Sequence, residues 1–256
     1  MIISNLPIGV LDSGIGGLST LAVLNKVLPY ENFIFYADHK NAPYGDKSKK
    51  EVEAFVYDII KFFVSQNVKA VVIACNTAVS VAIKRLRKEF NIPILGLEPA
   101  VKLAYDNCKE KDLLIMATKL TINGEKLKDL LNKLDIEKRV KKISASGLVE
   151  LIENKDDVNF YLKNLLNNIN KKKYSYLVLG CTHYIFVKKE IEMVIGKDIR
   201  LIDGNMGISL HLKNILEEND IKNLNNNKGK IQLITSGNNN DYEKLEYFYQ
   251  KALNLE

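Results

Sequence analysis

Short apolar runs alternate with longer amphipathic stretches along most of this 256-residue chain. Two of the runs, residues 71–75 and 176–181, end in a small residue followed by a cysteine. Such runs are typical of parallel strands buried on both faces, whereas the stretches between them have the period of helices. This alternation predicts βαβ units and a mainly parallel sheet. We expect strands at residues 8–11, 33–37, 71–74, 92–96, 113–117, 176–180, 200–202 and 230–234.

The spacing of the strand ends indicates an internal repeat. Asp12 precedes Cys75 by 63 residues, and Thr118 precedes Cys181 by the same interval, so an offset of 106 residues superposes both pairs. We therefore predict an α/β fold of two pseudo-symmetric, doubly wound domains with mainly parallel sheets. Ligands of such sheets bind beyond the carboxyl ends of the strands, so the active site is expected in the cleft between the domains. The expected domains are residues 1–97 with 209–256, carrying Cys75, and residues 98–208, carrying Cys181.

Composition and charge exclude several classes of protein. A hydrophobic content of 46% and a charged content of 27% are ordinary for a globular protein. The sequence has no apolar run long enough to span a bilayer, and we expect no secretory signal at its start. Three widely spaced cysteines argue against a disulfide framework, so we expect a cytoplasmic protein. The net charge of +6 is spread along the chain, which predicts no nucleic-acid surface and fits a small anionic substrate.

A glycine-rich turn, Gly14-Ile15-Gly16-Gly17, follows the first strand. Ser19 stands where a dinucleotide fingerprint needs its third glycine, and no phosphate-loop lysine follows. What remains is Asp12 and Ser13 at the ligand edge of the sheet. Free backbone donors open a helix there, and such donors suit a carboxylate as well as a phosphate.

Two of the three cysteines are candidates for chemistry. Cys108 lies in a helical context and is expected to be a packing residue. Cys75 and Cys181 each precede polar residues and then a predicted helix, whose N-terminus would lower the pKa of the thiol. Asp12 is expected beside Cys75 on the neighbouring strand, and His183 follows Cys181 by two residues.

Four chemistries could use this pair of cysteines. A redox dithiol usually has the spacing C-x-x-C, which the chain lacks, and zinc would want more ligands than Cys75, Cys181 and His183. A single nucleophilic cysteine with a histidine base would leave the other cysteine idle. Proton transfer by two bases, one on each face of a stereocentre, uses both cysteines and needs no cofactor.

The sequence resembles the glutamate racemases of the cofactor-independent aspartate/glutamate racemase superfamily over essentially its whole length. The resemblance rests on six motifs in the right order and on a terminal Thr235-Ser236-Gly237. The six are Asp12-Ser13-Gly14-Ile15-Gly16-Gly17, Pro43-Tyr44-Gly45, Ala74-Cys75-Asn76-Thr77-Ala78, Glu98-Pro99-Ala100, Ala117-Thr118 with Thr121, and Gly180-Cys181-Thr182-His183-Tyr184.

The resemblance implies an enzyme that interconverts L- and D-glutamate and supplies D-glutamate for peptidoglycan, without a cofactor or metal. It implies Cys75 and Cys181 as the acid/base residues, Asp12 and His183 as their supporting groups, and Glu153 as a glutamate of the cleft. The implied substrate-binding residues are Asp12, Ser13, Tyr44, Gly45, Asn76, Thr77, Thr118, Thr121, Thr182 and His183.

Other interpretations remain open. A racemase of aspartate or another small acid differs only in its side-chain pocket, and a non-catalytic ligand-binding module would use the same fold. The resemblance also leaves a homodimer open. His39 and His211 have no role in the pattern and are expected to be surface or packing residues.

Overall fold

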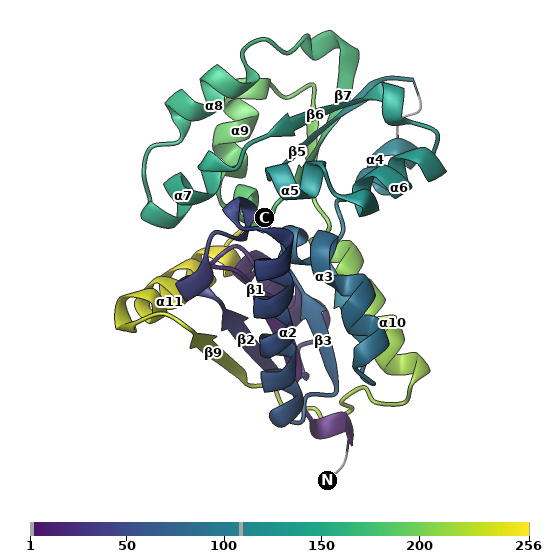
Figure 1. Ribbon diagram of the computed structural model, residues 1–256, viewed down its shortest axis with the longest axis vertical. Coiled ribbons are helices and arrows are strands. Elements are labelled where there is room, and N and C mark those ends of the chain that lie inside the picture. Colours follow the sequence, from purple (N-terminus) through teal and green to yellow (C-terminus); the bar gives the residue numbers. More distant parts are fainter. Residues whose placement is uncertain (1–2, 108–109, 256) are drawn as a thin grey trace.

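The computed structural model describes residues 3–107 and 110–255; Cys108 lies outside these ranges. The described chain contains two sheets, one above the other along the longest axis of the molecule (Figure 1). Strand order is β4-β3-β1-β2-β9 in the first sheet and β6-β5-β7-β8 in the second. Every strand pairing in both sheets is parallel, which confirms the predicted fold class.

The first half of the molecule is the first sheet with five helices. Its strands are β1 (Ile8–Asp12), β2 (Phe33–Ala37), β3 (Ala70–Ile73), β4 (Ile94–Gly96) and β9 (Ile231–Thr235). Its helices are α1 (Leu18–Val27), α2 (Lys49–Ser65), α3 (Asn76–Glu89), α10 (Asn205–Glu218) and α11 (Asn239–Leu253). Helix α2 begins where Ser48 and Glu51 bond each other's backbone N–H groups, which satisfies two donors that a helix start leaves free.

The second half is the second sheet with six helices. Its strands are β5 (Asp112–Ala117), β6 (Val140–Ser144), β7 (Tyr174–Gly180) and β8 (Arg200–Ile202). Its helices are α4 (Val101–Asn107), α5 (Lys119–Ile122), α6 (Glu125–Lys133), α7 (Gly147–Asn154), α8 (Asn159–Leu166) and α9 (Lys188–Ile195). Strand β6 was not predicted. It lies at the sheet edge and buries only Ile143 of its five residues, so its sequence lacks the apolar run of a central strand.

The two sheets repeat one topology. The order β4-β3-β1-β2 in the first sheet corresponds to β8-β7-β5-β6 in the second, and corresponding strands lie about 106 residues apart, the offset seen in the sequence. The unpredicted strand β6 is the counterpart of β2. In residues 3–107 and 110–255, no strand of the second sheet corresponds to β9, which extends the first sheet beyond β2.

A hydrophobic core continues from one half into the other. Helix α1 contacts both α10 and α11, and it also contacts the 3₁₀ segment η6 (Thr182–Val187) of the second half. One cluster of buried side chains accordingly includes Leu18 of α1 together with Tyr184 and Phe186 of η6. The carboxyl ends of β3 and β7 are thereby fixed in facing positions.

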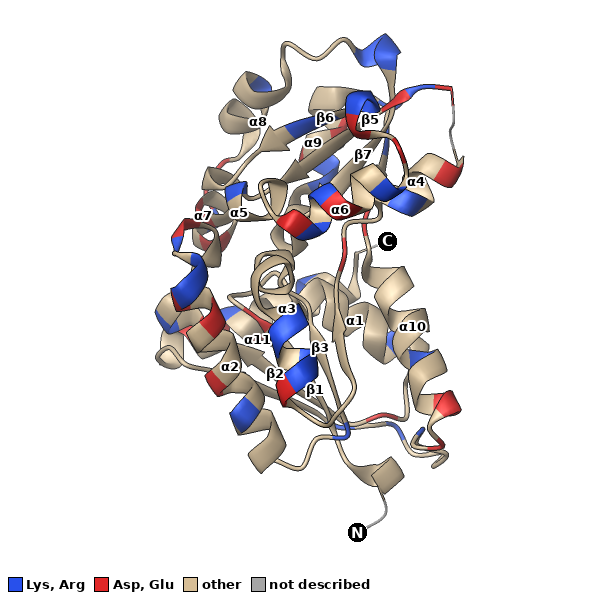
Figure 2. Cartoon of the chain, turned by 45° about the vertical axis from the view of Figure 1, so that its right-hand side comes forward, with Lys and Arg blue, Asp and Glu red and all other residues tan. Residues whose placement is uncertain are grey.

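Charged residues of both signs are interspersed on the outer helices, as Figure 2 shows for α2, α3 and α6. Among the residues that the structure describes, no helix has both the length and the apolar character needed to cross a membrane.

Candidate active site

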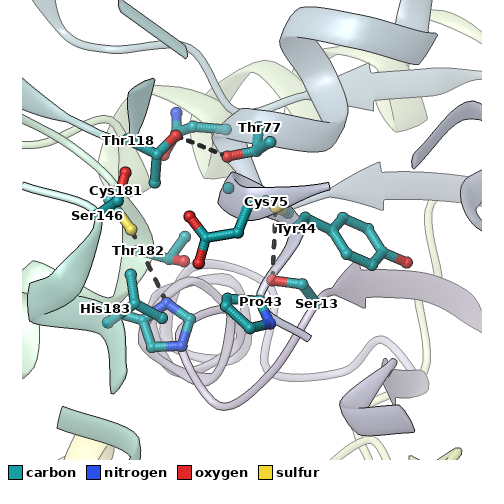
Figure 3. Close-up of a pocket in the computed structure, with 14 residues that line it drawn as sticks. Ser13, Pro43, Tyr44, Cys75, Thr77, Thr118, Ser146, Cys181, Thr182 and His183 are labelled. Carbon is teal, nitrogen blue, oxygen red and sulfur yellow. Dashed lines mark hydrogen bonds between the residues drawn. The ribbon is translucent and has the colours of Figure 1, made fainter. Parts of the chain in front are cut away.

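The carboxyl ends of the two sheets enclose a pocket that takes residues from both halves (Figure 3). The empty space between its walls is about 370 Å³, part of it open to solvent. The lining residues of the first half are Ser13, Pro43, Tyr44, Gly45, Asp46, Cys75, Asn76 and Thr77, and those of the second half are Thr118, Ser146, Val149, Cys181, Thr182 and His183. The pocket therefore brings together both candidate cysteines.

Cys75 caps the N-terminus of α3 directly after β3. Its sulfur donates a hydrogen bond to Oγ of Ser13 at 3.7 Å. Burial raises the pKa of the Cys75 thiol to about 12, and the charge of Asp12 on the neighbouring strand adds to the rise. The lowering predicted from the helix N-terminus is therefore wrong for Cys75, because desolvation of the thiolate outweighs the helix dipole.

Cys181 follows β7, and the 3₁₀ segment η6 begins after it in place of the predicted α-helix. Its sulfur lies 3.8 Å from Nδ1 of His183, whose Nε2 lies 2.8 Å from Oε1 of Glu153. Burial alone would lower the pKa of His183, but its hydrogen bonds to Cys181 and Glu153 raise that pKa well above its usual value. This rise favours the imidazolium form of His183 beside the Cys181 sulfur.

Glu153, on α7, reaches across to the glycine turn of the first half. Its Oε1 accepts a hydrogen bond from the backbone N–H of Ile15 at 3.0 Å. Burial would raise the pKa of Glu153, but the hydrogen bond and charge of His183, together with the N–H of Ile15, hold it at about 2. The Ile15 N–H, one of the free donors of the turn, therefore binds a carboxylate of the protein itself.

The glycines of this turn permit the close approach of the two halves. A Cβ atom on Gly14 would lie 2.2 Å from Oε1 of Glu153. A Cβ on Gly16 would lie 2.3 Å from Oγ1 of Thr182 and 2.4 Å from Nδ1 of His183. A larger side chain at Gly14 would displace the Glu153 carboxylate, and one at Gly16 would displace Thr182 and His183.

Asp12 and a row of threonines form further links across the pocket. The carboxylate of Asp12 accepts from the N–H of Gly14 at 2.9 Å and from Oγ1 of Thr182 at 3.1 Å. Burial raises the pKa of Asp12, and the positive charge of His183 opposes that rise. On the other side, Oγ1 of Thr77 lies 2.9 Å from Oγ1 of Thr118, which donates to Oγ1 of Thr121 at 3.1 Å.

Ten of the thirteen residues predicted for the site line the pocket; the other three, Asp12, Glu153 and Thr121, lie directly behind it. Tyr44 lines the pocket, but its hydroxyl donates to Oδ2 of Asp38 at 2.6 Å and points away from the cavity (Figure 3).

Sequence reasoning missed four lining residues: Pro43, Asp46, Ser146 and Val149. Ser146 lies just after β6, so applying the 106-residue offset to β2 would have placed it near the ligand edge of the second sheet. His211 is exposed, as expected, whereas the side chain of His39 is only 6% exposed and faces Glu153. Within the described ranges, no three His, Cys, Asp or Glu side chains are grouped as a metal ion would require.

Comparison with known proteins gives the class of this fold and site. A family model described as Asp/Glu/Hydantoin racemase matches residues 15–206, three quarters of the chain. The chain therefore belongs to the Asp/Glu/hydantoin racemase family, and it is an isomerase, a racemase.

Its similarity to individual members extends over nearly the full length. The chain is 44% identical over 241 residues to the glutamate racemase of Clostridium acetobutylicum, covering 92% of this chain and 94% of that protein. Its fold matches the glutamate racemase of Francisella tularensis in complex with D-glutamate, with a TM-score of 0.84, 29% identity and coverage of 96% and 94%. It also matches the Escherichia coli enzyme in complex with L-glutamate and the activator UDP-MurNAc-Ala, with a TM-score of 0.84, 27% identity and coverage of 96% and 95%. These findings confirm the resemblance inferred from the motifs.

Proposed function

We propose that this protein interconverts L- and D-glutamate by direct transfer of the α-proton between two cysteines. The observation that carries the proposal is the entry of Cys75 and Cys181 into one pocket from equivalent strands of the two halves. A thiol on each side of a bound stereocentre is what inversion by two bases requires. The relatives that bind D-glutamate and L-glutamate support glutamate as the substrate.

The proton balance of the reaction is simple. One cysteine, as thiolate, removes the α-proton from one face and becomes a thiol. The other cysteine, as thiol, gives its proton to the opposite face of the carbanionic intermediate and becomes a thiolate. The raised pKa of Cys75, about 12, favours its protonated form. The reverse reaction starts with the roles exchanged.

The lining residues include no lysine or arginine, so apart from His183 the substrate carboxylates meet neutral donors. Helix α3 begins at Asn76, and the N-terminus of a 14-residue helix favours an anion through its free N–H groups and its dipole. The hydroxyls of Thr77, Thr118 and Thr182 and the backbone near Gly45 complete this set, with Thr121 holding Thr118. Fixed donors around a desolvated carboxylate stabilise the charge that develops in the transition state.

Supporting residues differ on the two sides. Asp12 orients Thr182 and acts on Cys75 through its charge, and Ser13 holds the Cys75 sulfur. His183, held by Glu153, places a proton and a positive charge beside Cys181. Different groups therefore adjust the acid/base strength of the two cysteines: Asp12 and Ser13 act on Cys75, and His183 with Glu153 acts on Cys181.

In the cell, we propose that the product D-glutamate serves peptidoglycan synthesis. We propose that the two halves are two domains with one catalytic cysteine in each. The boundary expected at residue 208 falls inside α10 (Asn205–Glu218), so we place it before that helix, at residues 203–204.

The decisive experiment uses purified protein and L-glutamate in D₂O, without added pyridoxal phosphate or metal. Loss of optical rotation should accompany incorporation of deuterium at the α-carbon, and D-glutamate should give the mirror-image result. Complete lack of exchange would rule the proposal out. Exchange with aspartate but not glutamate would select a racemase of aspartate instead.

A further inference from the structure

The Glu153 carboxylate has four partners, and three of them lie in the first half. Its Oε1 meets Nε2 of His183 and the N–H of Ile15, as described above. Its Oε2 accepts from Nζ of Lys244 on α11 at 3.4 Å, and it lies 3.8 Å from Nε2 of His39. One carboxylate of the second half is therefore held by three separate segments of the first.

The orientation of the His39 ring follows from its second contact. Its Nδ1 lies 2.9 Å from Oγ1 of Thr235, and that oxygen already accepts the N–H of Gly237 at 3.0 Å. The Glu153 carboxylate that faces Nε2 favours the tautomer with the ring proton on Nε2, in which the Thr235 hydroxyl donates to Nδ1. Nε2 itself is buried, has no hydrogen-bond partner and faces Oε2 of Glu153.

We propose that His39 and Lys244 are positioning residues that hold the Glu153 carboxylate in place and through it orient His183 toward Cys181. The link to catalysis rests on the proposed function, whereas the link to His183 rests on the contacts alone. Lys244 supplies a positive charge, and His39, in the loop after β2, points Nε2 at Oε2 of Glu153 from 3.8 Å, too far for a hydrogen bond but close enough for an electrostatic contact. Neither residue touches the pocket, so both act only through Glu153.

The charges around His39 come from three elements. Glu153 faces it from α7, Asp241 and Lys244 from α11, and His183 from η6. Burial lowers the pKa of His39 below its ordinary value, although Glu153 and Asp241 oppose this. His39 is therefore neutral near pH 7, and the Glu153 carboxylate is balanced by the cations of His183 and Lys244.

Removing His39 or Lys244 should let the Glu153 carboxylate move and weaken its hydrogen bond to His183. A carboxylate that shifts by about 1 Å stabilises the imidazolium less, and misplacement on that scale can reduce a rate by about 10²-fold. His183 should then lose its proton at lower pH, and Cys181 should lose its cationic neighbour over part of the working range.

The two nitrogens of His39 can be tested separately. The amide nitrogen of His39→Gln comes near the position of Nε2 and keeps a donor toward Glu153. The amide of His39→Asn comes near Nδ1 and keeps only the contact with Thr235. Lys244→Met removes the ammonium at nearly constant side-chain length, and Lys251→Met removes an equivalent charge from the exposed face of the same helix as a control.

The first readout is the titration of His183 by NMR of ¹⁵N-labelled histidine, which is tractable because the chain contains only three histidines. We expect His39→Asn and Lys244→Met to move the midpoint to lower pH by about one unit, whereas His39→Gln and Lys251→Met leave it unchanged. The second readout is the pH profile of racemisation. We expect the basic limb to shift in parallel and kcat/KM at pH 8 to fall about 10-fold, with His39→Gln close to the wild type.

The outcomes separate this inference from the proposed function. An unchanged His183 titration in both His39→Asn and Lys244→Met would overturn the positioning role, whatever the activity. A shifted titration in a protein that does not racemise glutamate would support the positioning role and reject the proposed function. A fall in activity equal in His39→Gln and His39→Asn would also overturn it, since only one of them loses the donor to Glu153.

Discussion

The two cysteines occupy equivalent places in a repeated fold, yet their surroundings are opposite in charge. Cys75 lies beside the carboxylate of Asp12 and the hydroxyl of Ser13, and its pKa is raised to about 12. Cys181 lies beside His183, which Glu153 keeps protonated. The repeat therefore fixes where the thiols are, and the residues just beyond each strand fix the charge that each thiol faces. A chiral substrate presents two different faces, and this enzyme meets them with two different environments.

The halves also differ away from the pocket. In the first half, Lys69 and Glu31 form a buried ion pair at 2.5 Å, at the end of the sheet opposite the site. The equivalent positions in the second half are Ser175 and Glu137, and Glu137 instead pairs with Lys142 at the surface. The first half thus has a buried ion pair at a place where the second half has none.

Replacing either cysteine should have the largest effect. Cys75→Ala and Cys181→Ala each remove one of the two acid/base groups, so we expect racemisation to fall by about 10⁴-fold. Each variant keeps one thiol, so each should still exchange the α-proton of one enantiomer with D₂O, and the two variants should prefer opposite enantiomers. Polarimetry and NMR measure the two processes separately. A variant that racemises at the normal rate would remove that cysteine from the mechanism.

Lys69→Met should have the next largest effect, on stability. It leaves the Glu31 carboxylate buried without its cation, and breaking such a pair costs roughly 3–5 kcal/mol of unfolding free energy. Lys69 also donates to the carbonyls of Ser4 and Ile221 at 2.6 and 2.8 Å, so three segments lose a shared partner. Urea unfolding measures the loss, with exposed Lys61→Met as the control. Activity of the folded fraction should persist; a large loss of kcat/KM in folded protein would show that the two ends of the sheet are coupled.

Gly16→Ala tests how tightly the halves must close. Its methyl group would overlap Thr182 and His183, and the resulting displacement should lower kcat/KM by about 10²-fold with a smaller change in Tm. Gly207→Ala on α10 is the matched control, because a Cβ there meets no atom within 4 Å. Equal activity in the two variants would mean that the turn tolerates a wider separation than the structure has.

On stability, Glu153→Gln should have a smaller effect than Lys69→Met, visible as a change in acid stability. The pKa of Glu153 is lowered from its ordinary value of 4.5 to about 2. Ionised Glu153 therefore stabilises the fold fully at pH values above 4.5, and this stabilisation is lost as the pH falls toward 2. Between pH 6 and pH 3 the wild type should lose roughly 2 kcal/mol that the variant, with no proton to gain, does not lose. Urea unfolding at the two pH values measures the difference. Identical pH dependence in both proteins would show that Glu153 is not held as an anion.

Most of the fold could be predicted because buried central strands have an unmistakable sequence. Strands β3 and β7 are buried at most of their positions, so nearly every residue in them is apolar. Strand β6 was not predicted because an edge strand with lysines at two of its five positions resembles a polar loop. The repeat itself held the missing information, since the offset that relates Cys75 to Cys181 also carries β2 onto β6.

The site was predictable where chemistry follows a strand end and unpredictable where it depends on contacts between distant segments. Cys75, Cys181 and their neighbours satisfy the first condition. The bond from Ile15 to Glu153 joins residues 138 positions apart, and no local pattern encodes it. The same is true of the ionisation of Cys75, because a helix N-terminus can be read from the sequence but the depth of burial cannot. His39 became noticeable only when the structure placed its Nε2 against Glu153.

The path of the chain between the halves gives the molecule a natural pivot. It crosses at residues 97–100 and again at 203–204, and Gly204 packs so closely on Glu98 that a Cβ atom would lie 2.4 Å from the Glu98 carbonyl oxygen. Helices α7 and α11, which carry Glu153 and Lys244, lie at the far side of the molecule (Figure 1). If the halves rotated about the paired crossings, the side that carries α7 and α11 would move farthest, so Lys244 and His39 would separate from Glu153 while Gly204 stayed close to Glu98.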